Sequence, residues 1–161
     1  MSELVKFLHV LFSFTLFFGL GVAMMNSIRT RGLTVPSEIL PLWMSIKQAQ
    51  SRFVIPSGIL LIAFGYASSE MKKYSLFDTT WLWVSLLLSL IVLALGVFVM
   101  RRHTKNVIRE VNTAIASGNV MTAALKQRLT RKAPRYVGMF QMAALVTIVY
   151  LMVFGAAGKL P

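Results

Sequence analysis

His9 is the residue of this sequence with the clearest capacity for chemistry, because it lies inside an apolar run. The run "LVKFLHVLFSFTLFFGLG" covers residues 4–21 and carries one charge, at Lys6. An ionisable side chain within a membrane span generally faces the protein interior and marks a functional site or a polar partner. A neutral imidazole can ligate haem iron or the magnesium of a chlorophyll-type pigment. The alternative is a histidine hydrogen-bonded to a neighbouring helix, and the sequence leaves both open.

A second axial ligand for a haem is predicted from depth in the membrane. The other histidine, His103, lies at the opposite end of its span and is predicted to be a solvated interfacial residue. Met152 lies seven residues before Lys159, at a depth similar to that of His9. A His/Met pair is typical of cytochromes with a raised potential. The predicted cofactor site therefore comprises His9, which is also the predicted metal ligand, and Met152, with haem b or another tetrapyrrole as cofactor.

Methionine pairs suggest a further chemistry, copper handling, because thioether sulfur binds Cu(I). Met24 and Met25 end the first apolar run, and Met139 and Met142 begin the fourth, so both pairs are expected toward the same side of the membrane. Methionine is also ordinary flexible packing material. The chain has no cysteine, which excludes thiolate sites and disulfides. Its five acidic residues all lie outside the apolar stretches and no catalytic motif is recognised, so an enzyme is the less expected outcome.

The elements that must position these residues are four apolar stretches. Hydrophobic residues make up 57% of the 161 residues and charged residues 14%, which is typical of a polytopic membrane protein. About 20 apolar residues cross the roughly 30 Å hydrocarbon core as a helix. The sequence predicts an all-α fold, a four-transmembrane-helix bundle with short amphipathic helices in the cytoplasmic loops. The single domain covers residues 1–161, with spans over residues 4–25, 53–69, 79–100 and 137–158, the first of them retained rather than cleaved as a signal peptide.

Basic residues gather in the first and third loops, and this sets the predicted orientation. The net charge is +12, and Lys and Arg collect on the cytoplasmic side of bacterial inner-membrane proteins. Loops 26–52 and 101–136 are therefore predicted to be cytoplasmic, and both termini to lie outside. Anionic lipid is an expected partner, at about 1 kcal/mol per basic residue near the surface, whereas nucleic acid is not, because no recognition module accompanies the charge. Predicted lipid or partner contacts are Arg101, Arg102, Lys105, Arg109, Arg128, Arg131, Lys132, Trp43, Trp81 and Trp83.

Both cytoplasmic loops carry helix signals. In the third loop Gly118 and Asn119 tolerate the left-handed conformation at a helix C-terminus, which predicts a helical hairpin. In the first loop Thr34 or Ser37 is the predicted N-cap of a short helix. The apolar positions at helical spacing are Val107, Val111, Ala114 and Ile115 in the third loop and Ile39, Trp43 and Ile46 in the first.

Small and amide side chains in the spans predict contacts between helices. Glycine lets two backbones approach closely, and a buried amide finds a hydrogen-bond partner on a neighbouring helix. The amides are Asn26 and Gln141, and the glycines are Gly19, Gly21, Gly58, Gly65, Gly96 and Gly138.

Three segments together resemble a known family. They are "LVKFLHVLFSFTLFFGLG" at the start, "RFVIPSGILLIAFG" opening the second span and "IVYLMVFGAAGKLP" at the end. Their order and content are similar to an uncharacterised family of bacterial predicted integral membrane proteins, itself distantly similar to the CopD copper-resistance membrane domain and to HemJ-type protoporphyrinogen oxidases. The resemblance implies a four-helix bundle and, by analogy with HemJ, a haem-ligand role for His9.

The sequence favours a membrane protein with a structural task. Small size and little mass outside the spans predict a non-catalytic accessory subunit that packs against other protein subunits of a respiratory, photosynthetic or transport complex in the bacterial inner membrane. The alternative is a redox protein that binds haem b through His9. Copper handling by a CopD-like protein is the third hypothesis.

Overall fold

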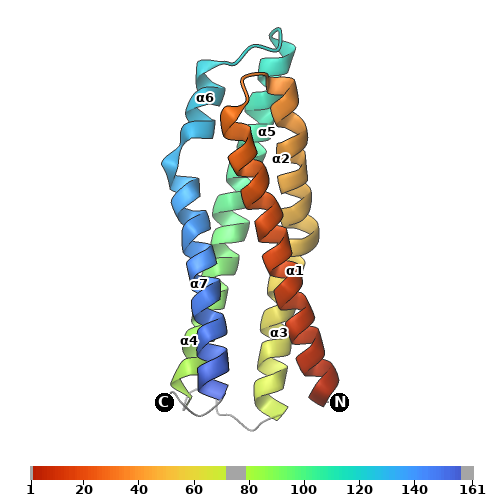
Figure 1. Cartoon of the computed structure of the whole chain (residues 1–161), viewed down its shortest axis with the longest axis vertical. Coiled ribbons are helices and arrows are strands. Elements are labelled where there is room, and N and C mark those ends of the chain that lie inside the picture. Colours follow the sequence, from red (N-terminus) through yellow and green to blue (C-terminus); the bar gives the residue numbers. More distant parts are fainter. Residues whose placement is uncertain (1, 72–78, 157–161) are drawn as a thin grey trace.

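The computed structural model describes residues 2–71 and 79–156, and every regular element in them is a helix (Figure 1). The predicted all-α membrane bundle is confirmed, since four helices are long and apolar enough to cross a membrane. The helices are α1 (Ser2–Arg29), α2 (Pro36–Ala49), α3 (Ile55–Met71), α4 (Thr80–Ala94), α5 (Arg101–Ala116), α6 (Ala123–Thr130) and α7 (Lys132–Ala156).

The helices of the first and third loops, α2 and α5, are continuous with the spans rather than separate from them. A π-helical turn, Gln50–Val54, joins α2 to α3, and a second, Leu95–Met100, joins α4 to α5. The resulting helix Thr80–Ala116 has 37 residues, or about 55 Å at 1.5 Å per residue. Because the hydrocarbon core is roughly 30 Å thick, the helices extend beyond the membrane at one end.

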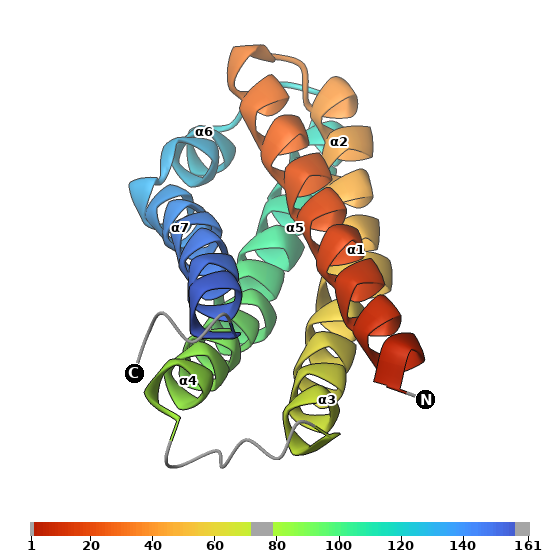
Figure 2. The ribbon, with the colours of Figure 1, turned by 60° about the horizontal axis from the view of Figure 1, so that its bottom comes forward.

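These extensions form a compact cap, which consists of α2, α5, α6 and the adjoining last turns of α1 (Figure 2). Apolar side chains from α2, α5 and α6 meet in a core in which no residue is more than 4% exposed. Removing this apolar surface from water stabilises the cap. The faces predicted from helical spacing are confirmed, and the core residues are Ile39, Trp43, Ile46, Val107, Val111, Ala114 and Leu125.

The turn between α5 and α6 holds the start of α2. Gly118 and Asn119 adopt positive φ angles of 100° and 59°, as predicted for this turn. The side-chain oxygen of Asn119 accepts a hydrogen bond from the Ser37 backbone N–H at 3.0 Å, and its amide donates to the Ser37 hydroxyl at 3.0 Å. The prediction of Thr34 or Ser37 as the N-cap was wrong, because α2 begins at Pro36 and its N-cap is Val35. The backbone N–H of Ser37, in the first turn of α2, is bonded instead by Asn119 from the turn after α5.

We expect Asn119→Gly to lower the free energy of unfolding of the cap by about 1 kcal/mol, the usual value of a lost N-cap. Glycine accepts the positive φ angle, so the change isolates the two hydrogen bonds to Ser37. Hydrogen exchange of the first α2 amides measures the effect. Asn112→Ala, on the exposed face of α5, is the matched control and should leave exchange in α2 unchanged. Equal protection in Asn119→Gly and wild type would contradict the capping role.

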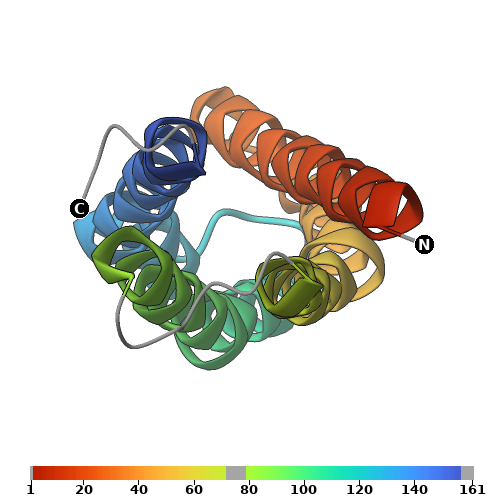
Figure 3. The same cartoon turned by 90° about the horizontal axis from the view of Figure 1, so that it is seen from below.

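Below the cap the helices associate as pairs, α1 along α3 and α4 along α7 (Figure 3). A second buried cluster joins the pairs inside the membrane part, and it consists of Leu16, Val54, Val92, Ala144, Leu145 and Ile148. The outer faces carry exposed large apolar side chains, which is the pattern that lipid requires of a spanning bundle. The fold thus has a membrane bundle and a polar-surfaced cap built from the same continuous helices.

Candidate functional site

His9 lies on the face of α1 that contacts α3. Its Nδ1 is 3.2 Å from the carbonyl oxygen of Leu61, and the half-buried ring rests on Gly65, where an added Cβ would be 3.1 Å from His9 Cε1. When the proton is on Nδ1, the ring donates to this carbonyl and Nε2 keeps its lone pair. The structure therefore contains the hydrogen bond to a neighbouring helix that was one of the two predictions for His9. The same bond leaves Nε2 as the ring atom that a metal would use.

Met152 is separated from this contact in the fold. It is half-buried on α7 and packs against the cluster that contains Val92 and Ile148, whereas the polar contact of His9 is with α3. Among the described contacts, none joins these two side chains as a ligand pair. His103 lies in the cap at the other end of the molecule, so it is remote from both.

The amides of the bundle bond between helices, as predicted. Gln141 is buried, and its Nε2 donates to the carbonyl oxygen of Val92 at 3.0 Å, which links α7 to α4. Asn26 Nδ2 donates to the Ser45 hydroxyl at 3.0 Å, which links α1 to α2. A cavity of about 20 Å³ beside Gln141 has room for a single water molecule.

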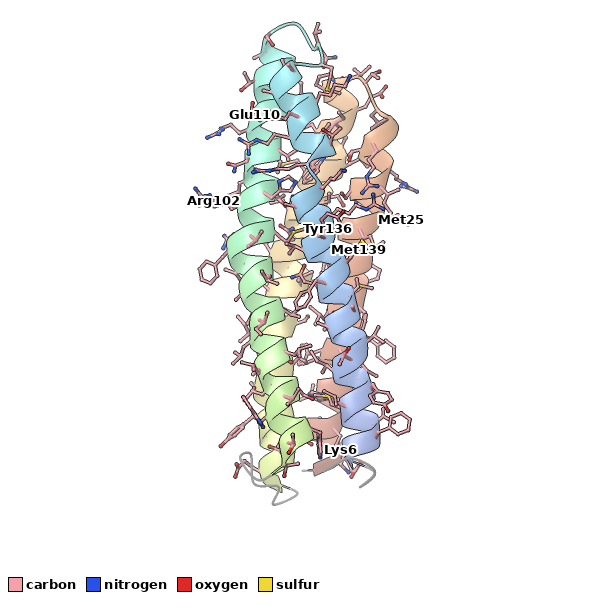
Figure 4. The ribbon with its side chains drawn as sticks, turned by 90° about the vertical axis from the view of Figure 1, so that its left-hand side faces the viewer. Lys6, Met25, Arg102, Glu110, Tyr136 and Met139 are labelled. Atoms are coloured by element: carbon pink, nitrogen blue, oxygen red, sulfur yellow. The ribbon has the colours of Figure 1, made fainter. Side chains whose placement is uncertain are left out.

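The methionine pairs proposed for copper face largely outward. Figure 4 shows Met25 on α1 and Met139 on α7 at similar heights in the bundle. Met24, Met25 and Met139 are exposed, and Met142 is half-buried. In residues 2–71 and 79–156 no three His, Cys, Asp or Glu side chains gather closely enough to hold a metal ion.

Two of the three tryptophans predicted to contact lipid are buried instead. Trp43 lies in the cap core with its ring edge-on to His103, the ring centroids 5.5 Å apart. Trp81 packs on α7 where Gly155 leaves room for its indole. Trp83 is exposed near the start of α4 and is free to reach lipid. Helical spacing alone did not reveal which face of each helix the neighbouring helices would cover.

Four of the predicted basic contact residues line one groove of about 700 Å³ in the cap. Arg102 and Arg109 come from α5, while Arg128 and Arg131 come from α6 and its C-terminal cap. Arg101, Lys105 and Lys132 are exposed outside this groove, hereafter the basic groove. Asn106 was missed by the sequence reasoning, although its spacing of four and three residues from two of the arginines puts it on their helical face.

The fold and its polar groups are those of an integral membrane protein, and comparison with known proteins agrees. The family described as predicted integral membrane protein (DUF2269) matches residues 3–155. The chain belongs to that family. The match includes the cap and the basic groove as well as the four helices that can span the membrane. No curated protein and no solved structure matches this chain.

His103 lies in the cap, beyond the last apolar residue of the third span, and lines the basic groove. Burial, together with the positive charges of Arg128 and Arg131, lowers the pKa of His103 to about 4. The imidazole is therefore neutral at pH 7. The prediction that His103 is a solvated residue was wrong. His103 is half-buried, because its ring packs against Trp43.

Proposed function

We propose that this chain is a non-catalytic accessory subunit of a larger membrane assembly. The observation that carries the proposal is the use of polar groups inside the bundle to bond neighbouring helices. His9 bonds to a carbonyl of α3, Gln141 to a carbonyl of α4, and Asn26 to a hydroxyl of α2. Such bonds fix helix pairs against each other, and a rigid, internally satisfied bundle is what a structural subunit requires.

The outer face of α1 is the surface that we assign to the partner. Phe7 and Phe14 lie seven residues apart and are 61% and 71% exposed, with Leu11 exposed between them. Alternating spacings of four and three residues place all three side chains on one face, the pattern by which helices pair. Aromatic side chains in such rows commonly anchor interfaces. The occupant that we assign to this face is a transmembrane helix of a partner subunit.

The position of the charge supports the orientation that we propose. Helix α1 begins and α7 ends at one end of the bundle, and the cap lies at the other (Figure 1). The cap carries the arginines of the basic groove. By the positive-inside rule the cap is cytoplasmic and the termini are outside, in a bacterial inner membrane.

The experiment tests whether the outer face of α1 binds a partner polypeptide or only contacts lipid. A tagged chain, solubilised from native membranes in a mild detergent, should carry a partner polypeptide in a fixed ratio. Phe7→Leu combined with Phe14→Leu keeps the face apolar and changes its shape, so the partner should be lost at least tenfold. Phe140→Leu combined with Phe154→Leu on α7 is the control and should retain it. Equal loss from both double variants, or no partner with wild type, would contradict the proposal.

A second candidate function, tetrapyrrole binding, rests on the orientation of the His9 ring. Metal-ligating histidines generally donate the second ring nitrogen to a carbonyl or carboxylate, which fixes the ring, and the contact with Leu61 provides this. The sequence resemblance to a family distantly similar to HemJ-type oxidases implies the same role for His9 by analogy. A haem b held by His9 would supply one-electron redox chemistry. Met152 packs against the cluster that contains Val92 and Ile148, so this candidate rests on His9 alone.

A visible absorption spectrum of the protein from native membranes, oxidised and then dithionite-reduced, tests the tetrapyrrole candidate. If His9 is a ligand, the wild type shows a Soret band and His9→Ala loses it or reduces it severalfold. Met152→Leu, half-buried on α7 and not in contact with His9 among the described contacts, is the control and should leave the bands unchanged. A colourless wild type would leave His9 as a residue that joins α1 to α3.

A further inference from the structure

The basic groove is lined by cationic and polar side chains, here called its wall, and by apolar ones, here called its floor. Its wall carries Arg102, Arg109, Arg128 and Arg131, together with Asn106 and the neutral His103. Its floor contains Phe98 and Val99, from the end of the third span, and Ala133 and Pro134 from the first turn of α7. The groove therefore lies where the apolar part of the helices meets the polar cap. That is the depth at which lipid headgroups are found.

The positive charge of the groove is only partly compensated. Glu110 is 3.8 Å from Arg109 and 3.8 Å from Arg128, longer than the roughly 2.7–2.9 Å of a charge-assisted hydrogen bond. No other ion pair involving the groove arginines is found in the described part of the chain. The N-terminus of α7 adds the positive end of a helix dipole at the floor.

The chemistry of these side chains indicates the ligand class. Guanidinium groups match the oxygen geometry of a phosphate and bind it in a bidentate manner. Four of them around one groove, with an amide donor beside them, offer more donors than the nearby carboxylate can use. Burial is the main cause of the lowered pKa of His103, and the positive charges of Arg128 and Arg131 in the groove add to it.

We propose that the basic groove is a binding site for a phosphate group, and specifically for that of an anionic phospholipid from the cytoplasmic leaflet. The floor distinguishes a lipid from a soluble phosphate compound. Phe98 is 73% exposed and precedes Arg102 by four residues, about one helical turn. An acyl chain can therefore run along Phe98 while the phosphate contacts the guanidinium groups. A soluble phosphate would leave this apolar surface unused.

Native mass spectrometry of the whole chain in a neutral detergent tests the site. The chain is titrated with phosphatidylglycerol, with zwitterionic phosphatidylcholine and, separately, with inorganic phosphate. The test variant is Arg102→Gln combined with Arg131→Gln, two exposed groove residues that form no ion pair with Glu110. The matched control is Lys126→Gln combined with Arg135→Gln, which removes the same charge from α6 and α7 outside the groove.

We expect one phosphatidylglycerol to bind the wild type at least tenfold more tightly than phosphatidylcholine. The groove variant should lose at least tenfold in that affinity, and the control less than threefold. Equal weakening in both variants would overturn the proposal, because it indicates a diffuse surface attraction. Inorganic phosphate binding as tightly as phosphatidylglycerol would overturn the assignment to lipid. Thermal unfolding midpoints of the variants in the absence of lipid, equal to wild type, exclude misfolding as the cause.

Discussion

Replacing Leu125 by alanine is expected to lower the free energy of unfolding of the cap by about 2–5 kcal/mol, the range for a large buried side chain cut to a methyl group. Leu125 is fully buried, and it is the buried residue of α6. Its backbone N–H also donates the N-cap hydrogen bond to the Thr122 side-chain oxygen at 3.2 Å. The side chain therefore docks an eight-residue helix that is too short to be stable alone.

The effect of Leu125→Ala should reach the basic groove as well, because α6 carries Arg128 and leads to Arg131. Amide hydrogen exchange in α5 and α6 should accelerate by more than tenfold, and the phosphatidylglycerol affinity should fall with it. Val120→Ala, in the exposed turn before α6, is the control and should change neither. If amide exchange in α6 were as slow in Leu125→Ala as in the wild type, contacts other than the cap core would hold the helix in place.

The second large effect is expected at Gly155. A Cβ built at this position collides with the indole ring of Trp81, at ring atoms close to the backbone of α4. The ring cannot move away without a change of rotamer or a separation of α7 from α4. Gly155→Ala should therefore cost about 1–3 kcal/mol, the usual penalty of overpacking. Thermal unfolding in detergent measures it.

Gly138→Ala is the matched control for this change, since it lies on the same helix and an added Cβ there meets nothing within 4 Å. Replacing a helical glycine in open space stabilises by about 0.5–1 kcal/mol. The two substitutions should thus shift the unfolding midpoint in opposite directions. A stabilising Gly155→Ala would mean that α4 and α7 do not approach each other as closely as the structure has them.

The spans were predictable because their signal is local. Runs of apolar residues long enough to cross a membrane need no knowledge of the neighbours, and all four predicted spans overlap the helices that can span. Residues 157–158 of the predicted fourth span lie outside the described residues. The cap faces were predictable for the same reason, since Val107 and Val111 show their shared face by spacing alone. The π-helical turns that make α2 and α4 continuous with α3 and α5 had no such signal, because an extra residue in a turn depends on how neighbouring helices are registered.

The glycine contacts between helices could be predicted only in part, because the contacting residue comes from a distant segment. Gly65 and Gly19 do meet neighbouring helices, at His9 and at Val54, as predicted. Gly21 and Gly138 meet nothing within 4 Å, and Gly155 was not foreseen because its partner tryptophan comes from another helix. The small side chain is visible in the sequence, whereas the residue that uses its space is known only from the fold.

Which basic residues lie together could likewise not be predicted from the sequence. The charge of the third loop was evident, and the prediction of a contact surface named seven basic residues without choosing among them. Rotation of α5 and the return of the chain through α6 bring four of these arginines to one groove. Helical spacing links Arg102 with Arg109, but the approach of Arg128 depends on the docking of α6 by Leu125.

The mass and composition of the wild-type protein extracted from native membranes, with its lipid belt retained, test the central claim most directly. The proposed role as an accessory subunit predicts a particle clearly heavier than the 18.0 kDa chain plus lipid, with a second polypeptide in a fixed ratio. A stable, colourless monomer of this chain would contradict that role and would also remove the tetrapyrrole candidate.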